Sequence, residues 1–255
     1  MENVLTPTFL IGVLTTVVAA VLSLLVFNRY RLRGRGVHLL LWGTGLALYF
    51  VAGLSETILA FGWNDLAFRL WYWTGALVIP PILGQGTIHL LVRRPYVAPI
   101  STIIVLTLAA ASLVWVLSIP LNAAAFVPGG DVARFLTESY REILPRSPVR
   151  SVLSPLMNGW GTLALVGGAI YSAVLFFRKE IMPNRVIGNI FIATGGLIPA
   201  LGGAMMRWAT TVPELSEIAA ATKYVGILGG LVLLFVGFQF AVGGAPQPRP
   251  APQAA

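Results

Sequence analysis

Three side chains with acid–base or metal-ligating chemistry lie within or beside the long apolar stretches of this chain. Glu56 is the only acidic residue well inside such a stretch, where a charge is costly unless it is paired or functional. His38 and His89, the only histidines, lie near the ends of two consecutive stretches. Gln85 precedes His89 by four residues, so a helix would place both on one face. These residues suggest an ion pair and a polar stripe, formed by Gln85 and His89, that faces either a neighbouring helix or a small cavity.

Glu56 has a charged candidate partner in a later stretch. Arg207 is expected at a similar depth of the membrane, and we predict an ion pair between Glu56 and Arg207 that joins two helices. The alternative is that Glu56 is a proton-coupling or ligand-binding carboxylate.

The two histidines should lie at the same membrane depth, because one follows the basic turn at residues 29–35 and the other precedes Arg93 and Arg94. Imidazoles on facing helices could ligate a haem or a chlorin. Histidines without a ligand are commoner at membrane interfaces, so we predict no cofactor and no metal site. Asn189 and the other polar residues in the apolar stretches should hydrogen-bond between helices.

The composition narrows the chemistry further. Cysteine is absent, which excludes disulfides, iron–sulfur clusters and thiolate zinc sites. We find no zinc-protease motif, serine elbow or phosphate-binding glycine loop, so no catalytic residue is predicted. The net charge of +8 reflects arginines in short turns between apolar stretches, and binding of nucleic acid is not expected.

Hydropathy predicts an all-α membrane protein. The chain is 57% hydrophobic and only 10% charged, and about 20 apolar residues are enough to cross a bilayer as a helix. We predict one bundle over residues 1–244 with seven spans, followed by a disordered Pro-rich cytoplasmic tail at 245–255. The predicted spans are 7–28, 37–62, 67–92, 97–120, 152–177, 186–209 and 222–243.

Charge predicts the orientation of the spans. Ten of the seventeen Lys and Arg residues fall on the side that holds the short basic turns, where Glu180 is the only acid. The positive-inside rule then places the N-terminus outside and the C-terminus in the cytoplasm. We therefore predict a multi-pass protein of the cytoplasmic (plasma, or cell inner) membrane. The long external connection, 121–151, includes "DVARFLTESYREIL", which is typical of an amphipathic helix on the membrane surface or capping the bundle.

Prolines and spacing suggest the internal organisation. Pro80 and Pro81 should kink the third span, and the carbonyls they free must be satisfied by neighbours or water. A shift of 151 positions lays the first three spans over the last three in the same orientation. Such a 3+1+3 repeat is found in some small transporters.

The stretches "LWGTGLALYF", "FRLWYWTGALVIPPILGQGTIHLL" and "GNIFIATGGLIPALGGAMM" resemble uncharacterised bacterial seven-helix membrane proteins. They are also distantly similar to the seven-helix N-terminal sensor region of histidine kinases, through Trp42, Gly45, Tyr49, Pro80 and Pro81. The resemblance implies a fold and no particular chemistry, and we expect no kinase or other output domain.

Three functions stay open from the sequence. The first is a non-catalytic accessory subunit or ligand-sensing bundle that acts through a membrane-protein partner or a second copy in the lipid bilayer. The second is a small-solute transporter built on the 3+1+3 repeat. The third is a tetrapyrrole-binding subunit that uses His38 and His89.

Overall fold

The computed structural model describes residues 5–32, 36–126, 136, 140–180, 183–209 and 216–243. Side chains are described over the same ranges, except at 200, 202–209, 216–224 and 242–243. These residues form helices and their connections, without a strand, which confirms the all-α fold class. Five helices in the described part are long and apolar enough to cross a membrane, which supports a membrane protein.

The helices agree with the predicted spans to within a few residues at most ends. Five are continuous: α1 (Pro7–Leu32), α2 (Val37–Ala60), α5 (Val97–Ser118), α9 (Pro183–Ala209) and α10 (Ser216–Gly243). Two further rods are composite. One joins α3 (Asp65–Trp73), the π-helical η1 (Thr74–Val78) and α4 (Ile79–Leu91); the other joins η3 (Val149–Leu153, π-helical), α7 (Ser154–Thr162), η4 (Leu163–Gly167, π-helical) and α8 (Gly168–Arg178). The predicted tail at 245–255 lies outside the described residues.

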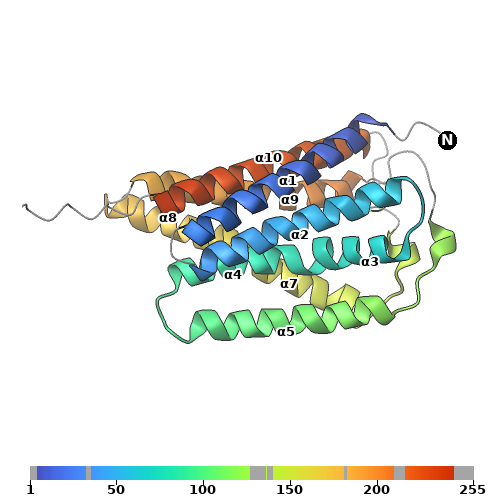
Figure 1. The fold of residues 1–255 in the computed structure, drawn as a ribbon, viewed down its shortest axis with the longest axis horizontal. Helices are drawn as coiled ribbons and strands as arrows, with labels where there is room; N and C mark the ends of the chain where they lie inside the picture. The colour runs from blue at the N-terminus through green and yellow to red at the C-terminus, as the bar shows by residue number, and fades with distance from the viewer. Residues whose placement is uncertain are drawn as a thin grey trace, which may run out of the picture.

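Six rods pack in a ring, and α5 lies outside it (Figure 1). Going round the ring, α1 packs on α2, α2 on the α3–α4 rod, that rod on the α7–α8 rod, and this rod on α9. The ring closes because α9 packs on α10 and α10 on α1. Helix α5 packs chiefly on the α3–α4 rod and leaves most of its apolar side chains exposed. The order of the rods therefore separates two groups of three and a seventh helix.

Large apolar side chains fill the described centre of this ring. One buried cluster draws residues from all six rods, and the indole of Trp42 on α2 stacks on the ring of Phe238 on α10 with centroids 4.0 Å apart. A second cluster lies between α2, α3, α5 and the connection after α5. Trp42 and Phe238 are almost completely buried, so contacts across the ring hold its two halves together.

The double proline interrupts the helix where the sequence predicts, as a π-helical turn that ends just before Pro80. Proline has no N–H, so Pro80 cannot bond the carbonyl of Ala76, four residues earlier. Helix α7 supplies the missing donors: Ser154 Oγ donates to Ala76 O at 2.7 Å and Asn158 Nδ2 donates to the same oxygen at 2.5 Å. The prediction that neighbours satisfy the freed backbone is confirmed for this carbonyl.

Glycine lets α7 come close enough to make those bonds. A Cβ built on Gly161 would lie 2.2 Å from the carbonyl carbon of Pro80 and 2.3 Å from the nitrogen of Pro81. One turn along the facing rod, a Cβ on Gly84 would lie 2.8 Å from the carbonyl oxygen of Gly161. Backbone therefore meets backbone at this crossing, the close approach that small residues permit in membrane bundles.

The connection after α5 covers one end of the bundle. Among its described residues, Leu136, Ile143 and Leu144 are buried in the cluster that also contains α3 and α5. The amphipathic pattern allowed a helix on the membrane surface or one that caps the bundle. The burial of these three side chains favours the cap. Val132 and Phe135, which belong to the same pattern, lie outside the described residues.

The Gly161 crossing can be tested with one added methyl group. We expect Gly161→Ala to lower the free energy of unfolding by about 1–3 kcal/mol, because overpacking forces backbone shifts. Gly159→Ala is the matched control, since a Cβ at Gly159 meets nothing within 4 Å. Thermal unfolding in mild detergent compares the two variants; equal losses would contradict the close crossing.

Candidate functional site

The polar stripe on the α3–α4 rod, which consists of Gln85 and His89, faces α5. His89 Nε2 lies 2.9 Å from Thr102 Oγ1, and the Gln85 side-chain oxygen accepts bonds from Ser101 Oγ at 2.9 Å and Thr102 Oγ1 at 3.2 Å. Gln85 is fully buried. The sequence left a neighbouring helix and a small cavity as alternatives for what this stripe faces, and these bonds join it to a neighbouring helix.

Thr102 has one hydroxyl proton and three neighbouring groups that could receive it. If the proton goes to Gln85 or to the carbonyl of Ala98, which is 2.9 Å away, Thr102 accepts from His89 and Nε2 of His89 carries hydrogen. If it goes to His89, Nε2 is the acceptor and the hydrogen of the neutral ring is on Nδ1. The amide nitrogen of Gln85 is buried and has no partner among the described residues, so the stripe keeps unused donor capacity.

His38 lies on the opposite side of this region, against Trp42. The imidazole of His38 meets the indole of Trp42 edge to face, with centroids 5.4 Å apart. A Cβ on Gly86 would lie 2.4 Å from Trp42 Nε1, so the indole N–H borders the backbone of α4. Trp42 Nε1 and His38 Nε2 are buried without a partner in the described part of the chain.

The two histidines are close enough to interact electrostatically, which agrees with their predicted common depth. Axial ligation of a tetrapyrrole requires one nitrogen of each ring to face a shared gap. Nε2 of His89 is instead occupied by Thr102 on α5, while His38 packs on its own helix. These contacts do not fit the two residues to a common metal, and the prediction of no cofactor remains a prediction.

Glu56 accepts a hydrogen bond from Trp71 Nε1 on α3, at 3.2 Å. The indole N–H therefore supports this carboxylate from the neighbouring rod. The side chain of Arg207 lies outside the described residues, so the predicted Glu56–Arg207 pair stays a prediction.

Asn189 joins two rods of the ring. Its Nδ2 donates to Ser172 Oγ at 2.7 Å, and both side chains are buried. The prediction of hydrogen bonds between helices is confirmed for Asn189 and for Asn158. It is also confirmed for Gln239 on α10, whose side-chain and main-chain oxygens accept bonds from Arg29 on α1.

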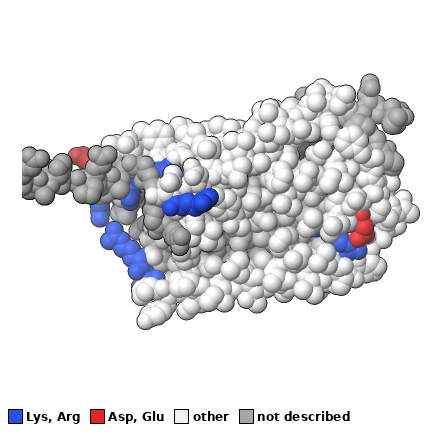
Figure 2. Space-filling view, viewed as in Figure 1, with Lys and Arg blue, Asp and Glu red and all other residues white. Residues whose placement is uncertain are grey.

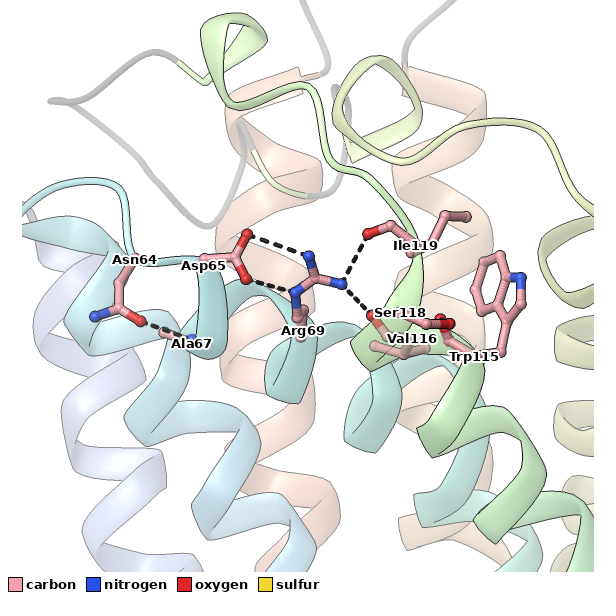
Figure 3. Close-up of polar contacts among 8 residues, drawn as sticks. All are labelled: Asn64, Asp65, Ala67, Arg69, Trp115, Val116, Ser118 and Ile119. Carbon is pink, nitrogen blue, oxygen red and sulfur yellow. Dashed lines mark hydrogen bonds and ion pairs between the residues drawn. The ribbon is translucent and has the colours of Figure 1, made fainter.

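The end of the bundle at which α3 begins carries a different polar network (Figure 3). Arg69 pairs with Asp65 one turn earlier, at 2.5 Å, and also donates to the carbonyls of Val116 and Ile119 at the end of α5. Asn64 caps α3 by accepting from Ala67 N at 2.9 Å. Arg69 thereby satisfies carbonyls that the last turn of a helix leaves open, and the network fastens α5 to α3.

The described residues contain no group of three or more His, Cys, Asp or Glu side chains suited to a metal ion. Comparisons of the chain with protein-family models, with curated proteins and with solved structures give no match.

Sequence reasoning missed the partners of the polar stripe. Ser101 and Thr102 are adjacent hydroxyl residues in the first turns of an otherwise apolar helix, at the end nearest to Arg94. His89 lies at the same end of the bundle, so the sequence alone could have shown that Ser101 and Thr102 lie at the depth of His89. Which face of α5 they occupy depends on packing, and hydropathy along α5 varies too little around the helix to show it.

Replacement of Thr102 by valine tests the stripe. Thr102→Val keeps the shape and removes the hydroxyl that contacts both His89 and Gln85. We expect a loss of about 0.6–1.7 kcal/mol, the range of single hydrogen bonds between membrane helices, measured by thermal unfolding in detergent. Thr107→Val is the control, because Thr107 lies exposed on the same helix. If the control lost as much stability, the role of the hydroxyl would be refuted.

Proposed function

We propose that the protein is a non-catalytic, seven-span integral protein of the cytoplasmic membrane that acts through another membrane protein, as an accessory subunit or a ligand-sensing bundle. Two helices beyond the five apolar ones contribute spans in this proposal: α9, with 27 residues, and α10, with 28. Both exceed the length of about 20 residues that crosses a bilayer.

The distribution of charge supports the orientation. Lys and Arg side chains gather mainly at the end of the bundle where α1 ends and α2 begins, at the left of Figure 2. By the positive-inside rule this end faces the cytoplasm. The Asp65–Arg69 end then faces outward, together with the N-terminus.

The filled centre of the ring is the observation that carries the proposal. Side chains from all six rods occupy it, and interior polar groups such as Asn158, Asn189 and Gln85 bond neighbouring helices. With its interior used for packing, the protein meets other molecules at its ends and its outer surface. Helix α5 offers such a surface, because it lies outside the ring and exposes isoleucine and leucine side chains along its length.

Ligand sensing is supported by the composite rods. Each contains π-helical turns, which often occur at functional sites. The η1 turn packs on α7, and the η4 turn packs on α4 and α9. A change in the packing of one composite rod would therefore alter the packing of the other, because the two share the crossing at Pro80 and Gly161.

A partner should remain attached during gentle extraction. We expect the tagged chain, expressed at native level and solubilised in mild detergent, to co-purify with another membrane protein and to elute above the size of its 27.3 kDa monomer. Isolation as a free monomer would count against the accessory role.

A cross-linking control sharpens that test, because the chain has no cysteine of its own. Leu106→Cys places a thiol on the exposed face of α5, and Ser112→Cys places one on its buried face. A membrane-permeant bifunctional maleimide should link the first variant, but not the second, to another protein in native membranes. Equal cross-linking of both would indicate random collision.

A small-solute transporter is the second candidate, and the order of the rods favours it. Two groups of three rods form the ring and α5 lies outside, as a 3+1+3 repeat requires. The buried cluster at the described centre of the ring opposes it, since alternating access needs a cavity between the halves.

Transport makes a distinct prediction for Glu56. In liposomes with the purified protein, uptake of a transported solute should saturate, and Glu56→Gln should reduce it about tenfold or more if the carboxylate couples protons, as intramembrane acids do in pumps. Glu142→Gln, at an exposed position, should leave uptake unchanged. Uptake equal to that of empty liposomes would exclude this candidate for the solutes tried.

A further inference from the structure

Three rods bring basic side chains together at the end where α1 ends. Arg29 extends from the last turns of α1, His38 from the first turn of α2 and Arg185 from the first turn of α9. Arg29 and Arg185, which are guanidinium cations, lie close enough to His38 to act on it electrostatically, and so does His89. Gln239 on α10 holds the guanidinium of Arg29 through two hydrogen bonds. We refer to Arg29, His38 and Arg185 as the basic cluster.

This arrangement has the properties of an anion site. The two guanidinium cations near His38 repel each other, and an anion between them removes the repulsion. Nε of Arg185 and Nε2 of His38 are buried and lack hydrogen-bond partners among the described residues. An anion with several oxygen acceptors would satisfy both.

Helix geometry adds to the positive field. Both α2, of 24 residues, and α9, of 27 residues, begin at this end. The N-terminus of a helix carries a partial positive charge and unpaired N–H groups. Gly36, at the N-cap of α2, has no side chain with which to cap those groups. Backbone N–H groups and basic side chains thus lie at the same end of the bundle.

We propose that the basic cluster binds the phosphate of an anionic lipid headgroup. The proposal rests on the proposed spans in one respect: they place the ends of α1, α2, α9 and α10 at the level of the headgroups on the cytoplasmic side. Basic pockets between helices at that depth suit anionic headgroups. The flanking apolar side chains, Leu32 and Val37, are exposed and would lie beside the acyl chains.

Arg185 is held in place for this role by an aromatic ring. Its guanidinium lies over the ring of Phe176 on α8, 5.6 Å from the centroid. Stacking leaves the edge of a guanidinium, where its N–H groups point, open to an oxyanion. The side chain is half-buried, so its charge is less screened than that of an arginine in an open turn.

The test uses the full chain in detergent, with thermal unfolding as the readout of lipid binding. Solubilised phosphatidylglycerol should raise the unfolding midpoint in a saturable manner, whereas phosphatidylcholine, which is zwitterionic, should not. Arg185→Gln should weaken the apparent affinity for phosphatidylglycerol about five- to tenfold, the effect of one arginine–phosphate contact. Arg94→Gln, an exposed arginine at the same end, removes the same charge and should change the affinity less than about twofold.

Other outcomes separate the alternatives. Equal weakening by Arg185→Gln and Arg94→Gln would show diffuse attraction to a basic end and overturn the site. Inorganic phosphate that stabilises with the same affinity as the lipid would overturn the headgroup assignment. If Arg185→Gln fails to fold, His38→Gln serves in its place, and full affinity in that variant would likewise overturn the site. No partner protein enters the assay, so failure of the lipid site is distinct from failure of the accessory role. The membrane location is tested separately, by whether the chain is found in the membrane fraction.

Discussion

The carbonyl of Ala76 sets the architecture of this bundle. In lipid no water is at hand for a backbone oxygen that loses its helical donor, so the double proline at 80 and 81 obliges another helix to supply one. Ser154 and Asn158 of α7 do so. To bring these side chains within reach, α7 must run backbone to backbone along the α3–α4 rod, and Gly161 and Gly84 allow that approach. This crossing joins the first three rods to the last three, and on that side the ring depends on it.

A shortage of carboxylates explains which groups the arginines bond. With seventeen basic and nine acidic residues, at least eight basic side chains cannot have a carboxylate of their own, and several arginines bond backbone and amide oxygens instead. Arg69 bonds the last carbonyls of α5, Arg150 bonds those of Arg141 and Leu144, and Arg29 bonds Gln239. Each bond ties one rod or connection to another where a helix ends. These arginines therefore stabilise the ends of helices and the connections between them.

Much of the fold follows from hydropathy alone, because helices in lipid must be long, apolar and internally hydrogen-bonded. The helix ends could be predicted from the sequence for that reason, and the interruption at Pro80 could be predicted because proline has no N–H. Only half of the candidate site could be predicted. Gln85 and His89 were identified because polar residues stand out in an apolar span, but their partners, Ser101 and Thr102, required knowledge of how α5 is rotated. Glu56 shows the same limit. Charge suggested Arg207 as its partner, which stays a prediction, but nothing in the sequence pointed to the indole of Trp71, which donates to Glu56, because indoles are too common near membrane surfaces to be read as partners.

The order of the rods and the packing between them favour different functions, and the Trp42–Phe238 stack bears on both. The order of the rods resembles two halves able to move against each other, which is what alternating access uses. Yet the stack joins α2 of one half to α10 of the other, 4.0 Å between ring centroids, and a rocking motion would have to separate two fully buried aromatic rings. Such a contact favours halves that stay together. A motion small enough to keep the stack, passed along the π-helical turns of the composite rods, can still alter the outer surface, and this is the kind of change that a sensing or accessory bundle conveys to a partner.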